Sequence, residues 1–187
     1  MRPPQTRQGA GDHILFIGRL SPEKGADTLI RAWSKSLGRL LIVGDGPDRT
    51  SLERQIVPCG DSVRLLGLQS PERCMELLRH ARALVVPSRS YEGFPLVVAE
   101  AYAHAVPVIA PALGGFPELV SHGNTGLLFV AGNAESLAAR IGEMMETSTS
   151  IRMGQKARRL YEERYTPRQN LDLLLRIYEQ ARRQRAG

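Results

Sequence analysis

The chain has 187 residues, of which 42% are hydrophobic and 24% charged, and its net charge is +6. This length predicts one domain or a domain with a short appendage, and the composition excludes a disordered, collagen-like or coiled-coil chain. The longest apolar run, residues 95–113, contains Glu100 and three prolines, so no transmembrane helix is expected. The first twelve residues contain no signal-peptide stretch, and two cysteines are too few for a disulfide scaffold. These features predict a cytoplasmic protein.

Short apolar runs rich in Val, Ile and Leu alternate along the chain with longer stretches of helical spacing. This alternation predicts parallel strands covered by helices. The runs lack a clean apolar–polar alternation, as expected for strands that are buried on both faces. The predicted strands are residues 13–17, 40–43, 63–66, 83–86, 106–109 and 126–129.

The helical stretches between these runs carry start signals. Ser21 and Pro22 form an N-cap and a first-turn proline for a helix whose apolar stripe extends from Leu29 to Leu37. The next helices are predicted at residues 48–57, 71–80, 95–104, 116–122 and 134–145. All six strand–helix steps point the same way, so the predicted fold class is α/β, a Rossmann-like, doubly wound sheet of about six parallel strands. Such sheets bind ligands beyond the carboxyl ends of their strands.

Two further helices, residues 150–164 and 167–183, follow without a strand between them. The second has six apolar positions among eight, which predicts contact with two surfaces or burial of both faces within this domain. The whole positive excess lies here, since residues 150–187 hold 10 basic and 4 acidic residues. This basic segment could face an anionic membrane or a second protein domain, or be a solvated helix face. This segment contains no recognised DNA- or RNA-binding motif, so nucleic acid is not an expected partner.

The loop after the first predicted strand suits an anion. Residues 18–25 open a helix, where backbone amides and the positive end of the helix dipole favour negative charge. Arg19 and Lys24 would add two positive charges, unless both project into solvent. The glycines of this loop and of residues 44–47 match no complete dinucleotide or P-loop motif.

A second concentration of polar residues lies at 88–100, again between a strand and a helix. Pro95 suits the first helical turn, which leaves the amides of the next two residues available to a phosphate. Glu92 lies in the loop and Glu100 lies inside an otherwise apolar helix. A carboxylate there is costly to bury unless it is hydrogen-bonded, and sugar hydroxyls are suitable partners.

Residues 13–145 resemble the C-terminal, nucleotide-sugar-binding domain of the GT-B glycosyltransferases of family GT4, which are retaining enzymes. The signature is the pair Glu92 and Glu100, separated by seven residues. The other motifs occur in the family's order: Gly18-Arg19-Leu20, Glu23-Lys24-Gly25, Val43-Gly44-Asp45-Gly46-Pro47, Pro87-Ser88, Gly93-Phe94-Pro95, Pro107-Val108-Ile109-Ala110, Gly114-Gly115, Glu118 and Gly123-x-x-Gly126-Leu127-Leu128.

The resemblance implies a role for each residue of the site. Arg19 and Lys24 would hold the donor's diphosphate, Glu92 would contact the transferred sugar, and Glu100 would bond the ribose hydroxyls. The implied catalytic residues are therefore Glu92, Arg19 and Lys24. Contacts to the donor are further implied for Gly18, Gly44, Gly67, Gly93, Phe94, Pro95, Leu96 and Val97, and the base is expected near residues 67–69.

No metal or other cofactor is expected beside the nucleotide sugar. The sequence contains no Asp-x-Asp metal motif. Breaking the glycosidic bond toward a nucleoside diphosphate builds negative charge, which needs preorganised donors. Arg19, Lys24 and the helix dipole would replace the divalent metal, in keeping with the metal independence of the family.

The resemblance covers one of the two lobes of a GT4 enzyme. Residues 1–12, with Arg2-Pro3-Pro4, look like the remnant of a linker, residues 13–149 would be the donor-binding domain, and residues 150–187 would pack toward a missing N-terminal, acceptor-binding lobe. The chain is then a piece of a longer enzyme, inactive alone and cytoplasmic or peripheral at a membrane. One alternative is a stand-alone nucleotide-sugar-binding subunit. Another is a nicotinamide oxidoreductase, which is disfavoured because the first loop of this chain lacks the dinucleotide-binding fingerprint.

One position departs from the family's pattern. The family often has glycine where Ala105 stands, directly after the helix that carries Glu100. If the backbone there needs the left-handed conformation, alanine costs on the order of 1 kcal/mol.

Overall fold

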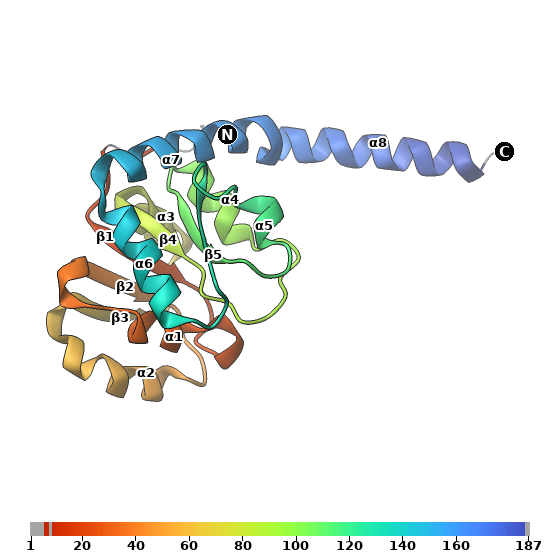
Figure 1. Ribbon diagram of the computed structural model, residues 1–187. Helices are drawn as coiled ribbons and strands as arrows, with labels where there is room; N and C mark the ends of the chain where they lie inside the picture. Colours follow the sequence, from red (N-terminus) through yellow and green to blue (C-terminus); the bar gives the residue numbers. More distant parts are fainter. Residues whose placement is uncertain (1–5, 8, 186–187) are drawn as a thin grey trace.

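A parallel β-sheet organises the computed structural model, which describes residues 6–7 and 9–185. Within this part of the chain the sheet has six strands in the order β3-β2-β1-β4-β5-β6, and each neighbouring pair is parallel (Figure 1). The strands are β1 (His13–Ile17), β2 (Arg39–Val43), β3 (Val63–Gly67), β4 (Ala81–Val85), β5 (Val108–Pro111) and β6 (Gly126–Phe129). The predicted doubly wound α/β sheet is confirmed. Strands β2 and β3 are added on one side of β1, and strands β4, β5 and β6 are added on its other side.

Helices cover both faces of the sheet. The α-helices are α1 (Ala26–Arg31), α2 (Arg49–Ile56), α3 (Pro71–His80), α4 (Leu96–Ala103), α5 (Phe116–Leu119), α6 (Ala134–Met145), α7 (Thr147–Leu160) and α8 (Pro167–Arg185). Short 3-10 turns occur at η1 (Pro22–Lys24), η2 (Lys35–Leu37) and η3 (Val57–Ser62), and a π turn, η4 (Tyr161–Tyr165), follows α7.

Two hydrophobic clusters hold these layers together. Successive residues of β1 point to opposite faces, so Phe16 joins the cluster beneath α1, α2 and α6, whereas Leu15 joins the cluster beneath α3, α4 and α5. Full burial of one such side chain stabilises the fold by about 1.5 to 3 kcal/mol. Helix α7 closes the end of the sheet, since Met153 packs in the first cluster and Ala157 in the second.

The helix predicted from Pro22 through Leu37 is wrong, because the chain breaks it at Gly25. Gly25 has a left-handed φ of 69°, and a Cβ atom there would lie 2.1 Å from the carbonyl oxygen of Pro87. Close approach of the loop after β4 therefore requires glycine and ends the first turn, so that α1 spans only Ala26–Arg31. This break brings the loops after β1 and β4 into contact.

Helix α5 is also shorter than the predicted stretch of residues 116–122. It ends at Leu119, after which Val120 has extended dihedral angles (φ −108°, ψ 103°). His122 then forms a parallel bridge with Gly126, and its ring Nδ1 accepts a hydrogen bond from the amide of Leu128. Pairing with the β6 region therefore replaces the last predicted helical turn.

The left-handed position after α4 is occupied by alanine. Ala105 has φ 60° and is the one non-glycine residue with positive φ among residues 6–7 and 9–185. The left-handed conformation that the family's glycine suggested for this position is therefore observed at Ala105. We expect Ala105→Gly to raise the free energy of unfolding by about 0.5 to 1 kcal/mol, because glycine adopts this conformation without the steric penalty of Cβ. Urea unfolding of the two proteins measures the difference.

The matched control for this substitution is Ala103→Gly, at the end of α4 itself. There the backbone is helical and glycine should lower the free energy of unfolding by about 1 kcal/mol. Equal destabilisation by both substitutions would show that the left-handed strain at Ala105 is not significant.

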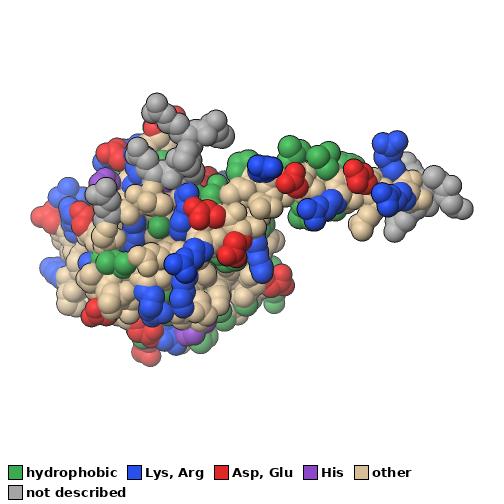
Figure 2. Space-filling view, turned by 90° about the horizontal axis from the view of Figure 1, so that it is seen from above, with side chains coloured by type: hydrophobic (Ala, Val, Ile, Leu, Met, Phe, Trp, Pro, Cys, Tyr) green, Lys and Arg blue, Asp and Glu red, His purple; other side chains and the backbone are tan. Residues whose placement is uncertain are grey.

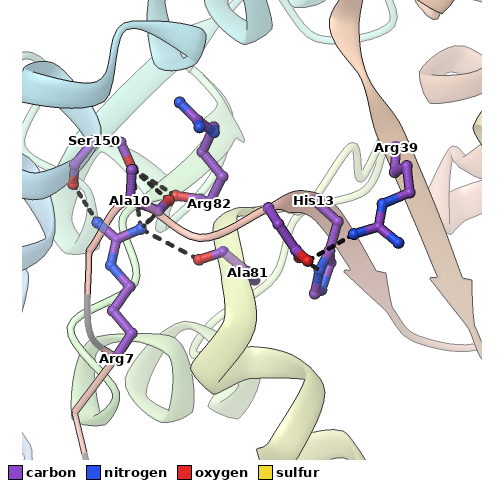
Figure 3. A network of polar contacts seen from close by, with 8 residues as sticks. Arg7, Ala10, His13, Arg39, Ala81, Arg82 and Ser150 are labelled. Atoms are coloured by element: carbon purple, nitrogen blue, oxygen red, sulfur yellow. Dashed lines mark hydrogen bonds and ion pairs between the residues drawn. The ribbon is translucent and has the colours of Figure 1, made fainter.

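Arg7 ties the N-terminal segment to the body of the domain. The side chain is buried, and its Nη1 donates to the carbonyl oxygens of Ala10 (2.8 Å), Arg82 (3.0 Å) and Ala81 (3.2 Å) and to Ser150 Oγ (3.0 Å). Nη2 donates to the carbonyl oxygen of Ser150, so the guanidinium joins the start of β4 to α7 (Figure 3). Burial, with a smaller contribution from Arg82, lowers the pKa of Arg7 to about 10, and the group stays charged at neutral pH.

The predicted division of the chain into three parts remains a prediction. Arg2-Pro3-Pro4, read as a linker remnant, lies outside the described residues. The described residues that follow are packed through Arg7, whose backbone amide also donates to the carbonyl oxygen of His104 (3.0 Å). The packed body therefore begins at least as early as residue 7.

Helix α8 projects away from the body (Figure 1). Six large hydrophobic side chains on it are between 44 and 66% exposed, namely Leu171, Leu173, Leu174, Leu175, Ile177 and Tyr178. Figure 2 shows hydrophobic side chains beside basic and acidic ones on the projecting helix. Burial of both faces within this domain, one of the two sequence alternatives, is therefore excluded for the described residues.

Candidate functional site

A cleft of about 570 Å³ opens beyond the carboxyl ends of β1, β2 and β3. This is the edge at which doubly wound sheets bind their ligands. The cleft is lined by Ile17, Gly18, Arg19, Val43, Gly44, Asp45, Gly46, Leu68, Gln69 and Cys74. Of the residues predicted to contact a donor, Gly18, Arg19 and Gly44 line the cleft directly, and Gly67 precedes two lining residues.

The floor of the cleft depends on backbone contacts among three strand ends. The amide of Gly18 donates to the carbonyl oxygen of Val43 (3.0 Å), and the amide of Gly44 donates to that of Gly67 (2.9 Å). Gly44 has φ 137°, and a Cβ atom there would lie 1.8 Å from the carbonyl oxygen of Gly18. Glycine is therefore required at residue 44 for the loops after β1 and β2 to meet. These two loops form the floor of the cleft.

The loops after β1 and β4 meet through Glu92. Lys24 Nζ lies 2.9 Å from Glu92 Oε1, and Ser88 Oγ donates to the same oxygen at 2.6 Å. Ser88 Oγ also lies 3.1 Å from the carbonyl oxygen of Glu23. The Glu92 side chain is only 15% exposed, so its carboxylate is held in one orientation by a lysine and a hydroxyl. Lys24 and Glu92, predicted from separate motifs, are thus direct partners.

The loop of residues 92–95 leads directly into α4. Pro95 is extended (φ −72°, ψ 109°) and α4 begins at Leu96, so the first-turn amides of Leu96 and Val97 have no acceptor within the helix. The amide of Gly115 donates to the carbonyl oxygen of Glu92 at 3.3 Å. The predicted approach of the Gly114-Gly115 pair to this loop is therefore observed.

The side chains of Arg19 and Glu100 make no hydrogen bond or ion pair with the described part of the chain. The Arg19 side chain is exposed at the cleft and makes no hydrogen bond or ion pair with another described side chain. Glu100, half-buried on α4, likewise makes none, and burial raises the pKa of its carboxyl group. Burial, with a smaller contribution from the charge of Glu100, raises the pKa of Cys74, which lines the cleft. Both side chains are therefore available to a ligand.

Sequence reasoning gave no role to two side chains that the structure brings to this site. Ser88 holds Glu92, and its signal was the Pro87-Ser88 pair directly after β4. Cys74, one of the two cysteines of the chain, lines the cleft from α3. Its signal is weak, because an exposed helical face and a cleft wall have the same sequence pattern.

Two kinds of feature are absent from the described residues. No group of His, Cys, Asp and Glu side chains among them is placed to hold a metal ion. No helix among them is both long and apolar enough to cross a membrane.

Comparison with known proteins places this geometry in a wider group. Residues 2–163 match the family described as glycosyl transferases group 1. The chain is 40% identical over 141 residues to a D-inositol 3-phosphate glycosyltransferase of Mycobacteroides abscessus, which covers 71% of this chain and 31% of the relative. The chain spans between 16 and 41% of the length of the curated relatives compared.

Two solved structures share the fold. HepE of Anabaena, in complex with UDP and glucose, is 26% identical with a TM-score of 0.80, over 92% of this chain and 48% of that one. Sucrose-phosphate synthase of Thermosynechococcus elongatus is 29% identical with a TM-score of 0.82, over 93% of this chain and 46% of that one. In each case the chain corresponds to about half of the compared structure.

Proposed function

This chain belongs to the group 1 glycosyl transferases, and from this premise we propose that it is the donor-binding half of a retaining, metal-independent enzyme of family GT4. The donor is a nucleoside-diphosphate sugar. The observation that carries the proposal is the cleft beyond β1–β3 together with the Lys24–Glu92–Ser88 contact after β4. The HepE structures contain UDP or UDP-glucose, which makes a uridine donor the first to test.

The nucleoside would occupy the cleft. Its base would lie against Leu68 and Gln69, and its ribose hydroxyls would donate to Glu100, whose half-buried carboxylate has no partner among the described residues. Hydrogen bonds from the ribose hydroxyls would offset the desolvation that raises the pKa of the Glu100 carboxyl group. Gly18 and Gly44 would allow the diphosphate to approach the backbone at the strand ends.

The sugar and its phosphate would lie at the next two loops. As the glycosidic bond breaks, negative charge grows on the departing diphosphate, and Arg19, Lys24 and the first-turn amides of Leu96 and Val97 would stabilise that charge. Glu92 would face the transferred sugar. Because Glu92 contacts Lys24, Lys24 would interact with both this carboxylate and the diphosphate of a bound donor.

Acceptor binding is proposed to require a second lobe. The relatives are longer than this chain, and α8 exposes six large hydrophobic side chains that such a lobe would cover. We therefore propose that the isolated chain binds the donor without transferring the sugar. The enzyme would be cytoplasmic, and peripheral contact of its basic C-terminal helices with anionic vesicles is a separate proposal that a sedimentation assay tests.

The test of the proposed function is calorimetry with UDP, GDP and ADP and their glucose or mannose derivatives, with NADH as the control. We expect one nucleotide series to bind with an affinity that EDTA does not change, and NADH not to bind. Absence of binding by all nucleotide sugars would contradict the proposal, and strong dependence on a divalent cation would contradict metal independence. Sugar transfer by this chain alone would contradict the assignment as half of an enzyme.

Glu100→Gln is expected to separate stability from binding. At neutral pH the substitution removes a partly desolvated charge, so the unliganded protein should gain up to about 1 kcal/mol, discounted because the group is half exposed. Since burial raises the folded pKa, this gain should disappear as the pH falls below the unfolded pKa, where both states are protonated. The nucleotide affinity should fall roughly tenfold, because the amide is a weaker acceptor.

The control is Glu76→Gln, an exposed carboxylate on α3 that pairs with Arg73. It should change both the free energy of unfolding and the affinity by less than about 0.5 kcal/mol. Unaltered nucleotide affinity of Glu100→Gln would exclude the proposed ribose contact.

A further inference from the structure

An aromatic contact joins the donor loop to the segment between α7 and α8. The rings of Phe94 and Tyr165 have centroids 5.5 Å apart and planes inclined by 59°, a tilted arrangement that is favourable for aromatic pairs. Phe94 lies two residues after Glu92, in the loop that leads into α4. Tyr165 is the last residue of the π turn η4, in the C-terminal part of the chain.

Tyr165 is fixed by its own surroundings. It is half-buried and packs against the hydrophobic cluster beneath α3, α4 and α5. The π turn that carries it is a rare backbone form that occurs frequently at functional sites, and it widens the helix by one residue before Thr166 becomes extended (φ −69°, ψ 152°). The ring of Tyr165 is thus attached to the core, whereas the ring of Phe94 is not.

Phe94 has little other support. Its side chain is 47% exposed. A hollow of about 370 Å³ lies beside it, and its lining also includes Leu96, Ala99, Arg164, Asn170 and Leu173. On this side the loop therefore rests on Tyr165 rather than on close-packed core. On the other side, Glu92 is held by Lys24 and Ser88.

We propose that Tyr165 is a positioning residue for the donor site. Through Phe94 it holds residues 92–97 in the geometry that presents Glu92 and the first-turn amides of Leu96 and Val97 to the sugar and its phosphate. The inference rests on the proposed function for the role of those groups. The cleft at β1–β3 is built from other elements, and Glu100 lies on α4 outside residues 92–97. Contacts to the nucleoside therefore depend on Tyr165 less than contacts to the sugar and its phosphate do.

The first measurement needs no ligand. Hydrogen exchange of the amides in residues 92–97 should be about tenfold faster in Tyr165→Ala than in the wild type, while exchange in β1–β3 stays unchanged. Tyr165→Phe keeps the ring and should behave as the wild type. Tyr161→Ala is the matched control, because Tyr161 is a half-buried residue of the same π turn but contacts Arg158 instead of Phe94.

The second measurement is calorimetry of the same variants with UDP-glucose and with UDP. In Tyr165→Ala the affinity for UDP-glucose should fall about tenfold and that for UDP no more than about threefold. If Tyr165→Ala does not fold, Phe94→Leu removes the same contact from the loop side and should give the same exchange pattern.

Wild-type exchange of residues 92–97 in a folded Tyr165→Ala variant, or an equal increase in Tyr161→Ala, would overturn the inference. If the wild-type chain binds no nucleotide sugar, the proposed function fails, and the exchange measurement alone then decides whether Tyr165 orders the loop.

Discussion

Replacing Arg7 with alanine is expected to lower the free energy of unfolding by about 3 kcal/mol. The buried guanidinium donates to the carbonyl oxygens of Ala10, Ala81, Arg82 and Ser150, and alanine at residue 7 would remove all of these hydrogen bonds. A buried polar group left without its partner costs about 1 to 3 kcal/mol, and several are affected at once. Urea unfolding followed by circular dichroism measures the change.

Two variants separate the causes of this loss. Arg7→Met fills most of the space but donates no hydrogen bond, so it should recover only the packing part. Arg64→Ala removes an exposed arginine that lies 3.8 Å from Asp61, and should change the free energy of unfolding by less than about 0.5 kcal/mol. If Arg7→Ala were as mild as Arg64→Ala, the contacts of Arg7 drawn in Figure 3 would not stabilise the fold.

Replacing Arg19 with alanine is expected to weaken binding of a nucleoside diphosphate by about 1.5 to 3 kcal/mol, or about 10- to 150-fold. Arg19 is exposed at the cleft with no hydrogen-bond or ion-pair partner for its side chain among the described residues, so its guanidinium can bind the diphosphate without breaking another contact. Calorimetry measures the loss, which should decrease at higher salt because the site is open to solvent.

Lys24→Ala should weaken binding less than Arg19→Ala, because the lysine already interacts with Glu92. Arg64→Ala, on β3 and outside the cleft-lining residues, is the control and should bind as the wild type. Neither Arg19→Ala nor Arg64→Ala should alter the free energy of unfolding by more than about 0.5 kcal/mol. Unchanged affinity in both Arg19→Ala and Lys24→Ala would exclude the proposed diphosphate site.

Much of the site was predictable because it follows strand ends. Gly18, Gly44 and Gly67 each come directly after, or end, a short apolar run, and parallel strands place such residues at one edge. The family's pattern supplied the significance of Glu92 and Glu100. It also indicated the left-handed backbone at Ala105, since the family's glycine marks that conformation.

The errors arose where distant residues decide the local backbone. The first predicted helix fails at Gly25 because Pro87 lies against it, and α5 ends early because His122 pairs with Gly126. The partners of Arg7 lie at residues 81, 82 and 150, so no local pattern indicates that its side chain is buried. Helical and capping preferences are local, so they contain no information about these contacts.

By itself the sequence determined the parallel sheet, the helices on both faces and the edge at which a ligand would lie. Those properties depend on side-chain periodicity and on the position of loops after strands, which neighbouring residues specify. Only the tertiary structure decided that Lys24 pairs with Glu92, 68 residues away, that Tyr165 supports Phe94, and that α8 leaves its apolar side chains exposed. Such contacts are decided by how separate elements pack, and packing brings together side chains that no local pattern relates.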